Sequence, residues 1–189
     1  MLAMDDARRT TLRDGTPIVI RPVAPEDREA LRESFERLSP ESRYRRFLAP
    51  MAHLSESQLT YLTRVDHHDH EALVALSEES GEGLGIARFV RLEDPDAAEV
   101  AVAVADSCQG RGLGTVLLAH LLARARQEGI ERFTATVLAD NRGSLELLST
   151  LGNTTVGPPQ DGAVELTIDL LDEADPDAAL AAVLKAAAR

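Results

Sequence analysis

The sequence predicts one mixed α/β domain built around a single central sheet, and three observations lead to this prediction. Helical patterns occupy residues 25–65, three β-type runs follow over residues 71–105, and strands then alternate with helices up to residue 171. Elements in this order join one sheet and bury their apolar faces against the helices. A chain of 189 residues is long enough to enclose one full core of this kind.

The amino-terminal part is predicted as one strand followed by three helices. Residues 16–23 form a short β-type run that ends at prolines. Pro25 opens the first helix, whose first turn is acidic and therefore complements the helix dipole. The second helix begins at Pro40. The third follows Ser55, which forms with Gln58 the Ser-x-x-Gln arrangement typical of a capping box.

In the middle of the chain the hydrophobic period changes from helical to alternating. Alternating apolar residues predict strands in ALVALSEE, GLGIARFVRLE and AAEVAVAVAD, and a later helix ends at the cap residue Gly129. The segments ERFTATVLA, NRGSLELLSTLG and GAVELTIDL then predict a strand, a helix that ends at Gly152, and a last strand. The strands at 98–105 and 132–138 flank one helix, so we expect them to be parallel with a right-handed crossover.

Composition and charge exclude several classes of function. The formal net charge is −12, so a nucleic-acid backbone would be repelled, and no basic stripe compensates for this. No apolar run approaches the roughly 20 residues that span a bilayer, and the first residues lack the apolar segment of a signal peptide. The single cysteine, Cys108, excludes an internal disulfide. We therefore expect a cytoplasmic protein that binds neither nucleic acid nor a membrane.

Three alternating glycines separate a valine-rich strand from an apolar helix in ADSCQGRGLGTVLLAHLLARA, residues 105–125. The dinucleotide fingerprint GxGxxG would need glycine where this chain has Thr115, and the Gly-Lys-Ser/Thr of a P-loop is absent. A glycine turn before a helix can still bind an anion, because the first backbone N–H groups of the helix are free and glycines let a pyrophosphate approach them. The alternative is a tight turn that holds no ligand.

The strand before this turn has one face of small residues. Glu99, Ala101, Ala103 and Ala105 alternate with valines, so the alanine face leaves space beside the strand. Glu99 begins this face. It is either a catalytic carboxylate, partly buried beside the alanines, or a solvated carboxylate at the sheet edge.

The segment Gln109-Gly110-Arg111-Gly112-Leu113-Gly114 resembles the Q/R-x-x-G-x-G/A signature of the GNAT superfamily of acyl-CoA-dependent N-acetyltransferases. The element order, the valine strand and a later ADN-x₁₀-G segment extend the resemblance over roughly residues 16–171. It implies a GNAT-like fold, in which helices flank a mixed, mostly antiparallel sheet with a parallel β-α-β core that binds acyl-CoA. Residues 1–15 are then an N-terminal extension, and residues 172–189 are an Ala-rich tail that either docks or frays.

The resemblance also implies how acetyl-CoA, the expected cosubstrate, is bound. The family places the CoA pyrophosphate on backbone N–H groups of the glycine turn and pairs the pantetheine arm with the preceding strand. The corresponding residues here are Val102, Ala103, Val104, Gln109, Gly110, Arg111, Gly112, Leu113, Gly114 and Thr115. Asn141 is expected to cap the helix that follows it, and in the family this position lies near the CoA arm.

A closer likeness links the chain to the acetyltransferase domain of bacterial Pat-type protein lysine acetyltransferases. It rests on IRPVAPEDREALRESFERLSPESRYRRF, on HLS-x-x-QL with a later VDH, and on AEVAVAVAD-x-x-QGRGLG. The likeness implies that lysine in acyl-CoA synthetases and related proteins accepts the acetyl group, and that Glu99 is the general base. Many members of the superfamily protonate the leaving thiolate with a Tyr where this chain has Leu148, so either solvent does so here or activity is reduced.

The implied reaction is direct attack by an amine, which is nucleophilic only when it is neutral. Glu99 would take its proton, and a backbone N–H near Val102 would bind the developing oxyanion. No covalent enzyme intermediate is needed, so Cys108 is expected to be a small turn residue. A small amine is the alternative acceptor, a CoA-binding sensor with little turnover is the competing class, and the chain is expected to be a monomer or homodimer.

One cluster of potential metal ligands, DHHDH at residues 66–70, also stands out in the sequence. Ligands must converge on one point, which consecutive residues of a short stretch rarely achieve. We therefore expect a polar loop before a strand, and no metal, with a place at the acceptor entrance left open as a further role for this loop.

Overall fold

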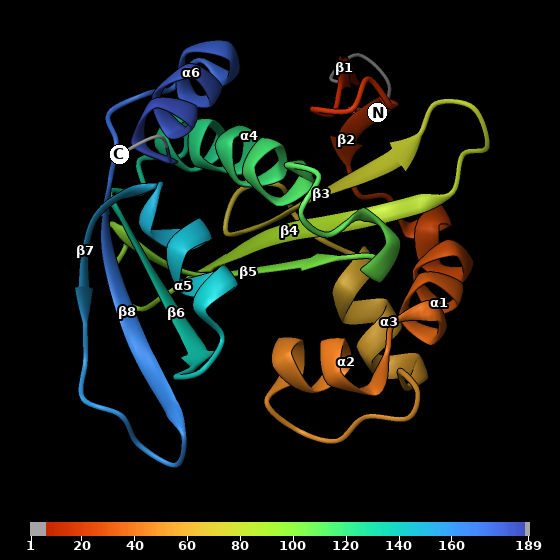
Figure 1. Ribbon diagram of the computed structural model, residues 1–189, viewed down its shortest axis with the longest axis horizontal. Coiled ribbons are helices and arrows are strands. Elements are labelled where there is room, and N and C mark those ends of the chain that lie inside the picture. The colour runs from red at the N-terminus through yellow and green to blue at the C-terminus, as the bar shows by residue number, and fades with distance from the viewer. Residues whose placement is uncertain (1–6, 188–189) are drawn as a thin grey trace.

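The computed structural model, which describes residues 7–187, places one eight-stranded sheet at the centre of the molecule (Figure 1). Its strand order is β1-β2-β3-β4-β5-β6-β8-β7, and every neighbouring pair is antiparallel except β5 and β6. A mixed, mostly antiparallel sheet flanked by helices is the fold class that the sequence predicts, and the structure confirms it.

The strands are β1 (Arg8–Thr11), β2 (Pro17–Pro22), β3 (His70–Ser77), β4 (Gly83–Arg91), β5 (Ala97–Val104), β6 (Arg132–Leu138), β7 (Gly152–Val156) and β8 (Ala163–Leu170). The α-helices are α1 (Arg28–Arg37), α2 (Pro40–Phe47), α3 (Glu56–Thr63), α4 (Leu113–Gln127), α5 (Arg142–Ser149) and α6 (Pro176–Ala187). Short 3-10 helices, η1 (Pro25–Asp27) and η2 (Asp106–Cys108), precede α1 and the glycine turn.

Two helical layers cover the sheet on opposite faces. On one face α4 lies across β3, β4 and β5 and is covered in turn by α6, so it is buried almost all round and belongs to the main core with Phe89 and Phe133 (Figure 1). On the other face α1, α2 and α3 form a smaller core around Phe35 and Leu59. The Ala-rich tail that contains α6 is thus docked, through Ala179 and Val183.

Two strands were not expected from the sequence. β1 carries the polar sequence RRTT, which has no alternation to signal a strand, yet it pairs along β2. The helix predicted to run to Gly152 ends at Ser149, and Gly152 instead begins β7. The other expected elements are present, including the capping box in which the Ser55 Oγ accepts from the N–H of Gln58 (3.2 Å).

The parallel pair β5–β6 separates soon after it forms. Pairing covers only Ala97–Arg132, Ala98–Phe133 and Glu99–Thr134, after which β5 continues beside β4 while β6 continues beside β8 (Figure 1). The remaining halves of β5 and β6 diverge and open a gap in the hydrogen-bonded sheet. This opening positions the site described below.

A buried arginine joins α3 to the sheet. Arg88 of β4 is 5% exposed; its Nη2 donates to the Leu62 carbonyl of α3 and its Nη1 to the Nε2 of His70, each at 3.1 Å. Burial, and next the charge of Arg88, lowers the pKa of His70 to about 4. His70 is therefore neutral at pH 7, with Nε2 as the acceptor.

We predict that Gly152→Ala destabilises the protein by about 2–4 kcal/mol. A Cβ at Gly152 would overlap the backbone carbonyl of Asp169 in β8, which cannot move without breaking the β7–β8 pairing. Urea unfolding measures the change. Gly143→Ala in the first turn of α5 is the control, because its Cβ meets no atom closer than 4.0 Å. If both variants were equally stable, the close approach of β7 and β8 would be disproved.

We also predict that His70 makes stability depend on pH. Unfolded His70 takes up a proton below about pH 6.5, whereas the folded protein excludes it down to about pH 4, so the free energy of unfolding falls through this window. His70→Gln keeps an oxygen acceptor for Arg88 and cannot titrate. The wild-type free energy of unfolding minus that of His70→Gln should drop by up to about 1.4 kcal/mol per pH unit. A difference that is independent of pH in urea titrations would contradict a neutral, buried His70.

Candidate functional site

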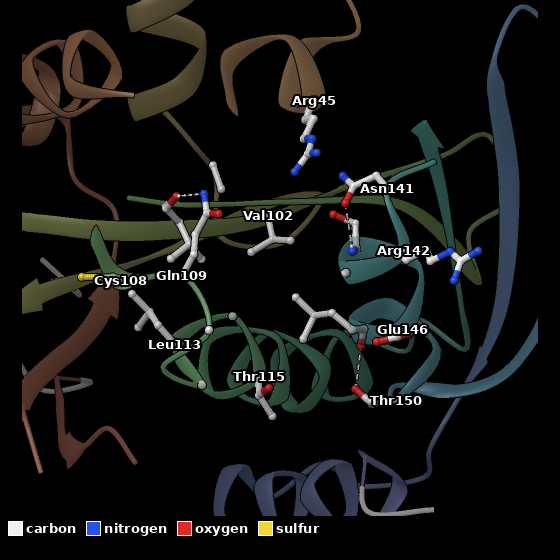
Figure 2. A pocket seen from close by; sticks show the side chains of 18 of the residues that line it. Arg45, Val102, Cys108, Gln109, Leu113, Thr115, Asn141, Arg142, Glu146 and Thr150 are labelled. Atoms are coloured by element: carbon white, nitrogen blue, oxygen red, sulfur yellow. Dashed lines mark hydrogen bonds between the residues drawn. The ribbon is translucent and has the colours of Figure 1, made fainter. Parts of the chain in front are cut away.

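A cavity of about 960 Å³ lies where β5 and β6 part (Figure 2). Its walls come from β5, the glycine turn, the first turns of α4 and α5, and α2, and the last residues of α6 also reach it. Of the residues expected to bind the cofactor, all but Arg111 line this cavity: Val102, Ala103, Val104, Gln109, Gly110, Gly112, Leu113, Gly114, Thr115 and Asn141.

β5 turns a free backbone edge toward the cavity. The N–H of Ala105 donates to the carbonyl of Leu84 in β4 (2.8 Å), and alternate residues of an antiparallel strand direct their backbone groups to opposite edges. The N–H and C=O groups of Val102 therefore face the opening, whereas those of Ala103 face β4. Because β6 has left β5 at Glu99, it supplies no partner for Val102. An extended chain in the cavity could pair with this edge as an added strand would.

The glycine turn presents a row of free donors at the start of α4. Gly110 and Gly112 have φ of +73° and +88°, a left-handed conformation that costs other residues roughly 1–2 kcal/mol, and Gly112 is the N-cap of α4. Within residues 7–187, no backbone carbonyl accepts a hydrogen bond from the N–H groups of residues 110–115. These donors and the helix dipole make the turn a site that favours anions.

Side chains on the outside of the turn fix its position. The Arg111 Nε donates to Asp14 Oδ2 (2.6 Å), which lowers the pKa of Asp14, and the same guanidinium bonds the Thr16 hydroxyl. Arg111 therefore ties the turn to the β1–β2 connection and is absent from the cavity lining. Gln109 Nε2 donates to Asp106 Oδ1 (3.0 Å).

The opposite wall is formed by α5. Asn141 caps this helix as the sequence predicts: its Oδ1 accepts from the N–H of Ser144 (3.2 Å). Leu148, at the position where many superfamily members have Tyr, is 3% exposed and lies in the main core. Its neighbours Glu146 and Leu147 line the cavity instead (Figure 2).

Glu99 lies at the point where β5 and β6 part. It is the last β5 residue paired with β6, opposite Thr134. Of the two alternatives for Glu99, a partly buried carboxylate or a solvated one, the structure shows an exposed residue. Its neighbours Ala98 and Val100 are buried in the main core. Burial lowers the pKa of Arg46 in α2, and the negative charge of Glu99 opposes this shift.

Sequence reasoning did not single out the positive charges of the site. Four arginines and two acids line the cavity: Arg13, Arg45, Arg46 and Arg142, with Asp140 and Glu146. The cavity therefore carries an excess of positive charge in a chain whose net charge is −12. These arginines come from the β1–β2 connection, α2 and α5, so no local motif could have revealed them.

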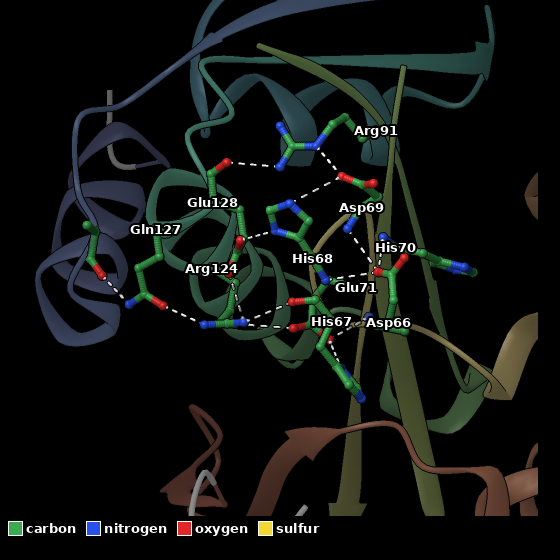
Figure 3. A network of polar contacts seen from close by, with 12 residues as sticks. Asp66, His67, His68, Asp69, His70, Glu71, Arg91, Arg124, Gln127 and Glu128 are labelled. Atoms are coloured by element: carbon green, nitrogen blue, oxygen red, sulfur yellow. Dashed lines mark hydrogen bonds and ion pairs between the residues drawn. The ribbon is translucent and has the colours of Figure 1, made fainter. Parts of the chain in front are cut away.

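The 66–70 cluster lies outside this cavity and is engaged in ion pairs (Figure 3). The His67 Nδ1 lies 2.8 Å from Oε1 of the buried Glu71, which also pairs with Arg124 (3.2 Å), and the Asp66 carboxylate accepts from three backbone N–H groups. Across the part of the chain that the structure describes, no group of three or more potential ligands converges as a metal site would require. No helix in that part is both long and apolar enough to cross a bilayer.

Comparison with known proteins places this geometry in a family. Residues 28–152 match the family described as Acetyltransferase (GNAT). An acetyltransferase of Pseudomonas aeruginosa is 37% identical over 153 residues, which are 80% of this chain and 82% of that protein. The acetyltransferase Pat of Mycolicibacterium smegmatis is 37% identical over 142 residues, or 75% of this chain, and the match spans only 42% of that longer protein.

A solved structure gives the same result. The crystal structure of the GNAT domain of PAT from S. lividans superposes with a TM-score of 0.80 at 35% identity, covering 87% of this chain and 97% of that domain. In this chain the parting strands, the glycine turn and the helix behind it surround the cavity described above. The chain is an acetyltransferase and belongs to the GNAT family.

Proposed function

We propose that this protein is a cytoplasmic, acetyl-CoA-dependent N-acetyltransferase that modifies lysine in proteins such as acyl-CoA synthetases. The observation that carries the proposal is the continuity of the cavity, which runs from the unpaired backbone of Val102 to the free N–H groups of residues 110–115. A cosubstrate with a peptide-like arm and a pyrophosphate has both sets of partners there. The likeness to Pat proteins supports lysine as the acceptor.

Acetyl-CoA would supply an activated thioester, and groups of the protein would bind it and position its reacting carbonyl. The glycine turn, with Arg13, Arg45 and Arg142 of the cavity, would hold the phosphates, and the edge of β5 would hold the arm. The N–H of Val102, which has no partner in the sheet, would donate to the oxygen of the reacting carbonyl as negative charge develops there.

Glu99 is our candidate for the group that removes the proton from the attacking amine. A lysine amine is neutral in only about one molecule in 10³ near pH 7, which adds roughly 4–5 kcal/mol to the barrier. A positioned carboxylate recovers about 10²–10⁴-fold in rate. Because Glu99 is exposed, it can take this proton either directly or through a water molecule.

The glycine turn can be tested by one added methyl group. We predict that Gly110→Ala weakens acetyl-CoA binding by about tenfold or more, because the left-handed backbone becomes strained and a methyl group enters the space left for the pyrophosphate. Isothermal titration gives the dissociation constant. Gly129→Ala is a matched control: its φ is +76°, its Cβ also meets nothing within 4 Å, and it lies outside the cavity. Equal losses in both variants would contradict a phosphate site at the turn.

The acceptor and the base are tested together by intact-mass analysis of a purified acyl-CoA synthetase incubated with this protein and acetyl-CoA. We expect a gain of one acetyl group with the wild type, and a rate about 10²–10⁴-fold lower with Glu99→Gln. Glu93→Gln, an exposed acid in the β4–β5 turn, is the control and should keep the wild-type rate.

Each result has a separate meaning. No transfer to the synthetase, together with transfer to small amines, would replace the protein lysine by a small acceptor. Unchanged turnover in Glu99→Gln would remove Glu99 as the base. Binding of acetyl-CoA without transfer to any amine would favour a CoA-binding sensor.

A further inference from the structure

A second, smaller pocket of about 80 Å³ adjoins the main cavity on the face of the sheet that carries α1, α2 and α3. The two spaces share four lining residues, Leu38, Arg46, Ala103 and Val104, so they meet beside the edge of β5. The walls of the small pocket are largely apolar, with Phe35, Leu62 and Ile86 among them. Three charged residues interrupt this apolar lining: Arg46, Arg88 and Asp27. The charge of Asp27 is already balanced by an ion pair with Arg21 (2.6 Å).

Neither arginine has an acidic partner. Arg88 donates only to the Leu62 carbonyl and to neutral His70, while Arg46 lies over the ring of Phe47, 4.8 Å from its centroid. In the described part of the chain no carboxylate oxygen lies within 4.0 Å of either guanidinium, although eighteen other contacts there join an arginine or histidine to a carboxylate. Arg13, Arg64 and Arg142 also lack such a partner in this part of the chain, but they are exposed to solvent, whereas Arg88 is buried.

The two charges also act on each other. Burial, and next the neighbouring charge of Arg46, lowers the pKa of Arg88 to about 10, so Arg88 still carries its proton at pH 7. Burial lowers the pKa of Arg46 as well, and Glu99 opposes that shift without forming an ion pair. Two guanidinium groups in apolar surroundings are costly unless an anion compensates for them. An arriving carboxylate would relieve both desolvation and mutual repulsion.

We propose that Arg46 and Arg88 form a carboxylate-binding subsite beside the reacting carbonyl, so that the enzyme selects a substrate that carries a carboxylate. The inference rests on the proposed function, because the carbonyl is placed at Val102, next to the shared residues Ala103 and Val104. The pocket holds a chain of only a few atoms. The carboxylate therefore belongs either to the far end of a short dicarboxylic acyl group on CoA, or to an acidic side chain next to the lysine that is acetylated.

The first arm of the test compares succinyl-CoA with butyryl-CoA by isothermal titration. Both acyl groups have four carbons, and they differ only in a terminal carboxylate or methyl group. If the acyl group is the source, the wild type should bind succinyl-CoA about 10- to 100-fold more tightly than butyryl-CoA, as expected for charge-assisted hydrogen bonds. The ratio of the two dissociation constants should fall toward one in Arg46→Gln. Because both ligands contain the same CoA moiety, a change in how the variant binds CoA itself cancels in this ratio.

The second arm keeps acetyl-CoA and compares two blocked peptides, one with Glu and one with Gln beside the target lysine. If the acceptor is the source, kcat/KM for the Glu peptide should be about 10- to 100-fold higher, and this ratio too should fall toward one in Arg46→Gln. Arg64→Gln, an exposed arginine at the end of α3 that lies outside both pockets, is the charge-matched control and should keep the wild-type ratios.

Arg88 anchors α3, so Arg88→Gln is accompanied by Arg88→Lys and by thermal unfolding of both variants. Discrimination in either arm that is lost in Arg46→Gln and kept in Arg64→Gln supports the subsite and identifies its source. Discrimination that survives in Arg46→Gln overturns it, as does equal binding of the two acyl-CoA esters in the first arm together with equal acetylation of the two peptides in the second. Failure of the proposed function appears differently: acetyl-CoA would then acetylate neither peptide nor synthetase, whatever the ratio of binding constants.

Discussion

The separation of β5 from β6 is the constraint on which the rest of this structure depends. Only three residue pairs hold the two strands together, and beyond Glu99–Thr134 the backbone groups of Val102 lose the partners that an intact sheet would supply. Unpaired backbone groups inside a protein carry a free-energy cost, so they are kept where something else can pair with them. The gap thus leaves an edge of β5 free to bind a ligand, and the helices α4 and α5, which follow β5 and β6 in the chain, form its walls.

The two strands stay apart because their connections hold them there. The glycine turn carries the chain from β5 into α4, and Arg111 fastens that turn to Asp14 on the far side. The other wall packs closely against the start of α4: a Cβ at Gly114 would lie 2.8 Å from Cδ2 of Leu147 in α5, so the absence of a side chain at Gly114 leaves room for the end of this leucine. The third glycine of the series therefore contributes to the packing of α5 against α4, while Gly110 and Gly112 shape the turn.

Most helices and strands of this fold could be predicted from the sequence, because residues within or next to each element specify it. The alternation in AEVAVAVAD, the capping box at Ser55 and the glycine turn each act within a few residues. What the sequence did not reveal depends on distant partners. β1 is a strand because it pairs with β2, and Gly152 begins a strand because the backbone of Asp169 in β8 lies directly beside it. The cavity arginines come together only after folding. The exposure of Glu99 likewise depends on what packs over its face of β5 after folding, which no pattern within β5 encodes.

The side chains of α5 bear on how the leaving thiolate would be protonated in the proposed reaction. Leu148 has no group that can donate a proton, and its side chain is buried in the core. Ser149 and Thr150 line the cavity, but their hydroxyls donate to the carbonyls of Leu145 (2.8 Å) and Leu147 (2.6 Å) in their own helix. A cavity of about 960 Å³ has ample room for water, and the expected base, Glu99, is exposed as well. Within the proposed reaction these contacts favour solvent as the proton donor for the thiolate, and the alternative is an enzyme whose activity is reduced without the tyrosine.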